Sequence, residues 1–302
     1  MLFVPLTEIK GRNKFALLRF LYKYEFLNVQ FAALLKKNIS ECFAVYLKNF
    51  CPQDLFGIFC AKKTVFHIFP FAGSGNEIFA SEDFINSFRS FYASGGFKNP
   101  VCINGAKPGT DLILKCFEKL NFKPAQVNEY NLLKLDGKIF LQKLKKDSAL
   151  NQKYRIVHCK ISLPEEIKRE LLALQAEYEK EEVVPGCFEF DENLCRLRFM
   201  ASLRTQFVLA LKNQENQLVA KGGTNAIGFK YVQLGGIFTR KEFRGKHCAK
   251  YLLESLIFSL LKIRKSVALF VKKENISAEK LYNSLGFKKI SEYSIAYFKH
   301  NL

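Results

Sequence analysis

Two strand-to-helix junctions near the C-terminal end of the chain bring together residues that could bind a phosphate-bearing ligand. The first is the apolar run Tyr231–Thr239, followed by the basic stretch Arg240–Lys246 and by helical spacing of apolar residues from Ala249 onward. The first amide groups of a helix have no partner within the helix, and the positive end of its dipole lies there. With arginine and lysine side chains beside them, these amides suit a pyrophosphate.

The second junction follows directly along the chain. An apolar run, Ser266–Val271, predicts a strand, and Asn275 is a suitable N-cap for a helix over Ile276–Leu285 that Gly286 ends. We therefore expect the two junctions to lie side by side.

These two segments resemble motifs A and B of the GNAT N-acetyltransferases. Motif A has the pattern Arg/Gln-x-x-Gly-x-Gly/Ala, and motif B carries an asparagine and a tyrosine on the second helix. The matching residues for motif A are Ile237, Phe238, Thr239 and Arg244-Gly245-Lys246-His247-Cys248-Ala249, and those for motif B are Leu269-Phe270-Val271, Asn275, Ala278, Leu281-Tyr282 and Gly286-Phe287. His247 stands where the family usually has a glycine that lets the backbone approach the pyrophosphate. If His247 needs a positive φ, the resemblance implies weaker coenzyme binding.

The resemblance implies a fold and an activity. The fold is a mixed α/β sheet of the GNAT acyl-CoA N-acyltransferase type. The activity is transfer of an acetyl group from acetyl-CoA to an amine by direct attack, with Tyr282 protonating the departing thiolate and Asn275 bonding the pantetheine amide. The implied coenzyme-binding residues are Ile237, Phe238, Thr239, Arg244, Gly245, Lys246, His247, Cys248, Ala249 and Asn275.

Each assignment has a structural alternative. Tyr282 could be a half-buried helix aromatic, Asn275 a helix cap alone, and Arg244 and Lys246 ordinary surface charges. A Cys/His nucleophile at His247-Cys248 is disfavoured, because adjacent residues on a helix do not face each other. For the whole protein, a GNAT-like binding or regulatory protein with little catalysis remains the alternative function.

Several features of the reaction stay open at this point. No His, Cys or carboxylate set has zinc spacing, so no metal is expected. The acceptor amine is not identified. The general base is not identified either, although four glutamates cluster where the acceptor side would be: Glu177, Glu179, Glu181 and Glu182.

The N-terminal part of the chain looks like a diverged copy of the same unit. A shift of 165 positions aligns Leu120-Asn121-Phe122-Lys123 with Leu285-Gly286-Phe287-Lys288, Phe117 with Tyr282 and Thr110 with Asn275. The charged stretch Lys143–Lys153 predicts a division into residues 1–150 and 151–302. Since the copy has phenylalanine in place of the tyrosine, we expect a structural or substrate-shaping role for it, and catalysis in residues 151–302.

Two further patterns in the N-terminal part predict structure alone. The apolar spacing over residues 15–34, which includes Phe15 and Leu18, predicts one or two core-facing helices. Gly73-x-Gly75 lies between β-rich runs and indicates a turn and no nucleotide site.

Composition limits the class of protein. The 302 residues include 47 Lys and Arg against 28 Asp and Glu, a net charge of +19 that favours an anionic ligand. The basic residues are spread along the chain without a nucleic-acid motif, which argues against nucleic acid as the partner. Nine cysteines without a Cys-x-x-Cys pair predict reduced thiols and a cytoplasmic location. The sequence has no apolar run of about 20 residues, so we expect no membrane span.

Overall fold

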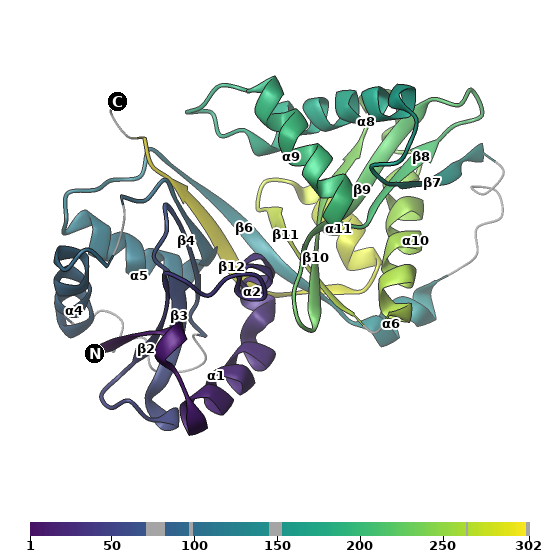
Figure 1. The fold of residues 1–302 in the computed structure, drawn as a ribbon. Coiled ribbons are helices and arrows are strands. Elements are labelled where there is room, and N and C mark those ends of the chain that lie inside the picture. The colour runs from purple at the N-terminus through teal and green to yellow at the C-terminus, as the bar shows by residue number, and fades with distance from the viewer. Residues whose placement is uncertain (71–81, 97–98, 145–152, 264, 300–302) are drawn as a thin grey trace.

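The computed structural model describes residues 1–70, 82–96, 99–144, 153–263 and 265–299. Within these residues twelve strands form one mixed sheet, with helices on both of its faces (Figure 1). The predicted α/β class with a mixed sheet is confirmed. Gly73-x-Gly75 and most of the stretch Lys143–Lys153 lie outside the described residues.

The order of elements occurs twice along the chain. The first set is β1 (Leu2–Pro5), α1 (Gly11–Tyr24), α2 (Val29–Leu35), β2 (Cys42–Tyr46), β3 (Leu55–Cys60), β4 (Thr64–Ile68), α4 (Glu82–Ala93), β5 (Cys102–Ala106), α5 (Lys107–Glu118) and β6 (Gln126–Leu135). The second set is β7 (Arg155–Cys159), α8 (Glu165–Tyr178), α9 (Glu192–Thr205), β8 (Val208–Lys212), β9 (Leu218–Ile227), β10 (Tyr231–Thr239), α10 (Cys248–Lys262), β11 (Ser266–Lys272), α11 (Ile276–Ser284) and β12 (Phe287–Tyr297). A short helix, α6 (Gly137–Lys143), follows the first set. The repetition confirms two tandem copies of one fold.

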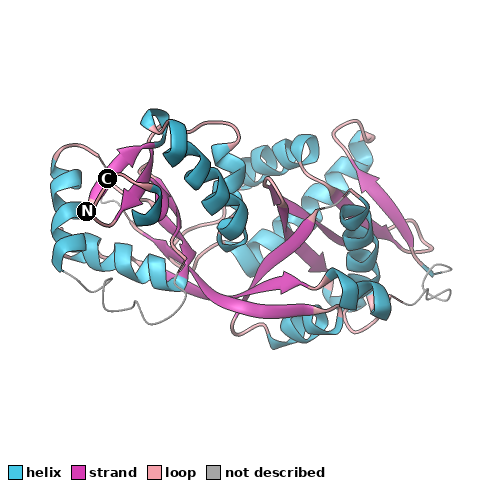
Figure 2. Cartoon of the chain, turned by 90° about the horizontal axis from the view of Figure 1, so that it is seen from below, coloured by secondary structure: helices cyan, strands magenta, loops and turns pink. Residues whose placement is uncertain are grey.

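The two copies exchange their last strands. The sheet order is β1-β2-β3-β4-β5-β12-β6-β11-β10-β9-β8-β7, so β12 pairs with β5 of the first copy and β6 pairs with β11 of the second. The two exchanged strands also pair with each other along most of their length, from Phe287↔Leu135 to Tyr297↔Gln126. In Figures 1 and 2 these long strands run from one half of the molecule into the other. The halves are therefore joined through a continuous hydrogen-bonded sheet.

Each half has a helix layer on each face of its part of the sheet. In the second half, α10 and α11 cover one face through Leu252, Leu256 and Tyr282, and α8 and α9 cover the other through Leu171 and Phe199. The first half has the same arrangement, with α1 and α2 on one face and α4 and α5 on the other. Burial of these apolar faces positions the ends of β10 and β11 between two helix layers.

One side-chain contact fixes the start of β10 to the first half. Glu25, which follows α1 and is fully buried, accepts hydrogen bonds from the backbone N–H groups of Lys230, at 2.8 Å, and Tyr231. Burial raises the pKa of Glu25, although both amides and nearby lysines act against that shift. The strand that enters the motif region is thus held by a carboxylate about 200 positions earlier in the chain.

The helical prediction for residues 15–34 was right about the helices but wrong about two residues. Phe15 is 71% exposed and Leu18 is 50% exposed, whereas α1 buries Leu17, Phe20 and Leu21. The run from Phe15 to Phe20 contains more apolar residues than one helix face can bury, and the face that meets the sheet is set by the neighbouring elements.

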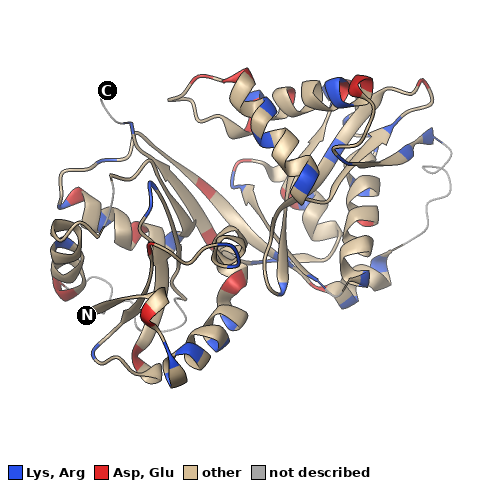
Figure 3. Ribbon diagram, viewed as in Figure 1, with Lys and Arg blue, Asp and Glu red and all other residues tan. Residues whose placement is uncertain are grey.

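Charged residues are distributed over the whole molecule. Figure 3 shows Lys and Arg on both halves, including several along α1. None of the described helices is long and apolar enough to cross a membrane.

Candidate functional site

A cavity of about 1030 Å³ opens where β10 and β11 separate. The two strands pair in parallel only over Tyr231↔Ser266, Val232↔Val267 and Gln233↔Ala268. Beyond these pairs Leu234–Thr239 and Leu269–Lys272 line the cavity from its two sides. Backbone groups on these diverging segments can then bond a ligand, because the neighbouring strand no longer uses them.

β10 also carries a bulge at the cavity wall. Its pairing with β9 changes register between Gly235 and Phe238, and Gly236 has a φ of +63°. A left-handed residue of this kind favours glycine, since a side chain would crowd the backbone. The bulge turns the peptide groups around Gly236 out of the regular ladder.

The start of α10 lies at one end of the cavity. Gly245 and His247 have φ values of +75° and +59°, and His247 is the N-cap residue without a side-chain cap. The first helical bond joins the Tyr251 N–H to the His247 carbonyl at 3.0 Å, so the amides of the preceding first turn have no carbonyl one turn earlier. Gly245, His247, Cys248, Ala249 and Lys250 line the cavity here.

The two cationic residues predicted to bind phosphate in this loop, Arg244 and Lys246, differ in their position relative to the cavity. Arg244 lines the cavity, donates through Nε to the Thr239 carbonyl at 3.0 Å, and forms an ion pair with Glu181 at 2.7 Å. Lys246 is not among the lining residues, and its ammonium lies 5.1 Å from the ring centroid of Phe243. Arg244 is therefore the better placed of the two for a ligand in the cavity.

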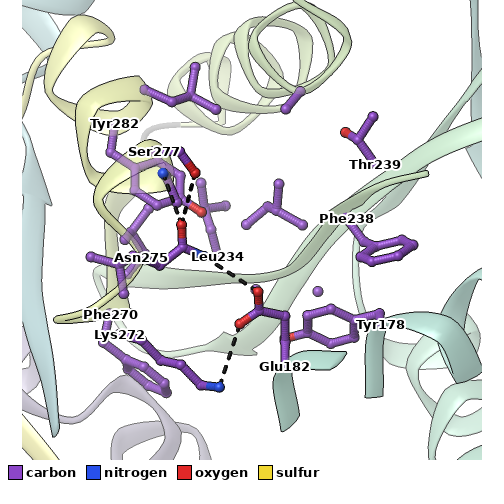
Figure 4. Close-up of a pocket in the computed structure, with 18 of the residues that line it drawn as sticks. Tyr178, Glu182, Leu234, Phe238, Thr239, Phe270, Lys272, Asn275, Ser277 and Tyr282 are labelled. Atoms are coloured by element: carbon purple, nitrogen blue, oxygen red, sulfur yellow. Dashed lines mark hydrogen bonds and ion pairs between the residues drawn. The ribbon is translucent and has the colours of Figure 1, made fainter. Parts of the chain in front are cut away.

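The start of α11 forms the opposite side. The Asn275 carbonyl oxygen accepts from the Ala278 N–H and from the Ser277 hydroxyl, both at 3.1 Å, and its amide donates to Glu182 at 3.4 Å. Asn275 is thus a helix cap whose amide faces a carboxylate (Figure 4). Its bond to Glu182 would have to open before the Asn275 amide could donate to a pantetheine carbonyl.

Tyr282 comes from the middle of α11 and lies at the cavity. Its side chain is 7% exposed, and burial, with smaller contributions from Tyr178 and Glu182, raises its pKa above the usual range. The hydroxyl therefore stays protonated at neutral pH, which suits a proton donor.

Two carboxylates that follow α8, Glu181 and Glu182, lie near the motif residues. The segment Glu179–Val183 is a single π-helical turn, a feature often found at functional sites. Glu181 pairs with Arg244, while Glu182 lies between the Asn275 amide and the Lys272 ammonium, at 3.6 Å from the latter. Of the four glutamates noted in the sequence, Glu181 and Glu182 line the cavity and Glu177 and Glu179 do not.

The first half of the chain supplies another part of the wall. Gln30, Asn104 and Tyr130 line the cavity together with Ile295 and Tyr297 of the exchanged strand β12. Sequence reasoning missed these residues, and it missed Tyr178, because their place depends on pairing between distant strands and on helix packing.

The corresponding place in the first half is filled by side chains. β4 and β5 pair over Thr64↔Cys102 to Phe66↔Asn104, and beyond them the buried His67 lies against Gly105 and bonds Thr110 at 2.9 Å. A Cβ at Gly105 would lie 2.2 Å from the His67 ring, so the imidazole fills this space. Thr110, the position aligned with Asn275, is therefore part of a packed core.

Most of the site residues predicted from the sequence line the cavity, and Lys246 does not. Ten of them line the cavity: Ile237, Phe238, Thr239, Arg244, Gly245, His247, Cys248, Ala249, Asn275 and Tyr282. Cys248 is buried at the base of α10, with its thiol 3.9 Å from the Lys246 carbonyl. In the described part of the chain no group of His, Cys, Asp and Glu residues is arranged to hold a metal ion.

Comparison with known proteins identifies a family match and a shared fold. Residues 170–287 match the sequence model of the acetyltransferase (GNAT) family. No curated protein matches the sequence of this chain.

Solved structures resemble the chain at low sequence identity. An X-ray structure of a Drosophila protein is 11% identical over 96% of each chain, with a TM-score of 0.64. A tandem GNAT protein from the clavulanic acid biosynthesis pathway is 12% identical over 98% of this chain and 97% of its own, with a TM-score of 0.51. A GNAT-family structure from Novosphingobium aromaticivorans is 19% identical over 58% of this chain and 65% of its own, with a TM-score of 0.42. The first two likenesses show that the fold extends over nearly the whole chain.

Proposed function

We propose that this chain, which carries a domain of the GNAT acetyltransferase family at residues 170–287, is an N-acetyltransferase that moves an acetyl group from acetyl-CoA to an amine. The observation that carries the proposal is the cavity between β10 and β11, with the uncapped start of α10 at one end and the Tyr282 hydroxyl toward the other. This arrangement offers a site for the coenzyme phosphates and a proton donor within one cavity.

The residues present fit acetyl-CoA as a co-substrate. The first-turn amides of α10 and the Arg244 guanidinium suit the pyrophosphate. The diverging backbone of Ile237–Thr239 suits the pantetheine arm, and the Thr239 hydroxyl is buried there without a hydrogen-bond partner. A buried hydroxyl in that state stabilises a ligand that supplies the missing bond.

Acetyl transfer needs a hydrogen-bond donor for the negative charge that develops on the thioester oxygen. It also needs a proton for the departing thiolate. The amine nitrogen forms a bond to the thioester carbonyl carbon, the carbon–sulfur bond breaks, and the products are an N-acetyl amide and free thiol. A backbone N–H of the β10 bulge can bond the thioester oxygen as its negative charge grows. The neutral amine attacks, so its nitrogen becomes cationic as the new bond forms. Tyr282 gives its proton to the departing sulfur and regains one through water from that cationic nitrogen.

We propose that residues 151–302 carry out the reaction. Residues 1–150 would then form part of the cavity wall at which the acceptor amine binds. Asn104 and Tyr130 of the first half meet Glu182 and Tyr178 of the second around the same cavity. Carboxylate and aromatic side chains of this kind suit a cationic amine. His67 occupies the place that a coenzyme arm would need in the first half, which supports a single active site.

The direct test is calorimetry with acetyl-CoA, followed by a panel of amines with free thiol as the readout. We expect acetyl-CoA to bind at one site per chain, and at least one amine to release thiol faster than the solvent alone. Failure of the full chain to bind acetyl-CoA would contradict the proposal.

A GNAT-like binding protein without catalysis is the second candidate, and the backbone of His247 favours it. His247 has a φ of +59°, the left-handed conformation in which the family usually places glycine. The Cβ of His247 therefore keeps a phosphate farther from the backbone than a glycine at this position would. Binding of acetyl-CoA without thiol release by any amine is the result that this candidate predicts.

A further inference from the structure

Lys221 is a buried cation in the strand next to the bulge. It lies on β9, directly opposite Phe238 of β10, and is 2% exposed. Its ammonium lies 4.4 Å from the ring centroid of Tyr178 and 5.8 Å from that of Phe199, under helices α8 and α9. A lysine almost never occupies such a place unless its charge has a defined partner.

The partner is the backbone of the bulge. The Lys221 ammonium donates a hydrogen bond of 2.9 Å to the Gly236 carbonyl. The backbone of Gly236 also lies close enough to the Tyr178 hydroxyl to lower its pKa against the effect of burial. The Gly236 peptide is thus held from the α8 and α9 face of the sheet.

The geometry of the peptide bond then fixes the next amide. A trans peptide is planar, and its N–H points away from its C=O. Since the Gly236 carbonyl points to Lys221, the Ile237 N–H points away from Lys221. In the register of β9 and β10, Gly236 and Ile237 together stand opposite Gly222, and Ile237 lines the cavity.

We propose that Lys221 is a positioning residue, which holds and polarises the Gly236–Ile237 peptide so that the Ile237 N–H can stabilise negative charge on the thioester oxygen. The inference rests on the acetyl transfer proposed above. A cation bonded to the carbonyl draws electron density from the amide and strengthens its N–H as a donor, by the cooperativity known for chains of hydrogen bonds. Lys221 touches neither the substrate nor the coenzyme, and it acts through this one peptide.

The charge of Lys221 depends on pH near neutrality. Burial lowers the pKa of Lys221 to about 7, and the nearby carboxylate of Glu179 opposes that shift. The Cys195 and Cys159 thiols also lie close, and burial raises their own pKa values to about 12. These groups face the ammonium from the π-helical turn, from α9 and from β7, and Tyr178 faces it from α8. The Gly236–Ile237 peptide is therefore polarised only while Lys221 is protonated, and this polarisation is lost as the pH rises through about 7.

The test uses the full chain with acetyl-CoA labelled with carbon-13 at the thioester carbonyl. A hydrogen bond to that oxygen shifts the carbonyl infrared band to lower frequency, so the band of the bound thioester reports the Ile237 N–H without any turnover. We expect the shift to be clear in wild type below pH 7 and to weaken as the pH rises through 7. Lys221→Met should give a weak shift that does not change with pH. Below pH 7 it should lower kcat about 10-fold relative to wild type, less than the 10²–10³-fold loss of a whole oxyanion donor, with an unchanged Kd for acetyl-CoA.

A matched control and the wild-type titration keep the test decisive. Lys160→Met removes an exposed lysine and should leave both the band and kcat unchanged. A band in folded Lys221→Met that equals wild type would overturn the inference while leaving the acetyltransferase proposal intact. If Lys221→Met does not fold, a wild-type band that is constant from pH 6 to 9 would overturn it instead. If wild type fails to bind acetyl-CoA, the proposed function and the inference both fall.

Discussion

Replacing Glu25 should destabilise the protein by an amount that follows from its hydrogen bonds. Glu25→Ala removes the acceptor of the Lys230 and Tyr231 amides at the start of β10. A buried donor left without a partner costs about 1–3 kcal/mol. Lys230 is only partly buried, so we expect a total loss of about 2–4 kcal/mol in the free energy of unfolding. Urea unfolding followed by circular dichroism measures this loss.

Glu25→Gln separates the hydrogen bonds from the charge. The glutamine carbonyl can still accept from both amides, so this variant should lie within about 1 kcal/mol of wild type at pH 7. Burial raises the pKa of Glu25 in the folded state above its ordinary value of 4.5. A raised carboxyl pKa contributes stability that is present below that ordinary value and is lost as the pH rises through the folded-state pKa. Wild type should therefore lose stability relative to Glu25→Gln as the pH rises from 4 toward 7.

Two outcomes would refute this reasoning. Equal stability of the alanine and glutamine variants would mean that the carboxylate does not hold the strand. A difference between wild type and Glu25→Gln that stays constant from pH 4 to 7 would mean that burial does not raise the pKa. Glu118→Ala removes an exposed glutamate of α5 and is the control for loss of a carboxylate. It should leave the free energy of unfolding nearly unchanged.

The remaining predictions concern the cavity. Tyr282→Phe should lower kcat about 10²–10⁴-fold in the thiol-release assay while calorimetry shows unchanged coenzyme affinity, and an unchanged kcat would make Tyr282 a core aromatic only. Arg244→Ala should weaken coenzyme binding and its salt dependence more than Lys246→Ala does, and equal effects in calorimetry would contradict the difference in their positions. Glu181→Gln should strengthen coenzyme binding, because it releases Arg244 from its ion pair, and weaker binding would refute that. His247→Val should cost about 1–2 kcal/mol in urea unfolding relative to His247→Gly, since the residue is left-handed, and equal stability would exclude backbone strain there.

The elements around the motifs could be predicted from the sequence because their signals are local. Tyr231–Thr239 was predicted as a strand and is one, with the same bounds. Asn275 was predicted as a helix cap and accepts from the Ala278 N–H. Strand propensity, capping and a glycine stop act within a few residues, so a single sequence suffices to place them.

The walls of the cavity could not be predicted in the same way. Tyr130 and Tyr297 reach it only because β6 and β12 cross between the halves, and no local pattern determines which distant strands pair. Lys221 does leave a signal in the sequence. It is a lysine within the run Leu218–Gly222, all of which is buried, and such a residue needs a partner that the surrounding sequence does not supply.

The exchange of strands gives the first copy a structural role that needs no chemistry of its own. β12 leaves the second copy after α11 and pairs with β5, so the edge of β11 that faces away from β10 would lack a neighbour without β6. An exposed edge of that kind leaves backbone groups unpaired and invites association with other chains. The same β6 carries Tyr130 to the cavity, and β12 carries Tyr297. The first copy therefore completes both the sheet and the wall of the cavity, while the His67 side chain fills the corresponding place in its own half.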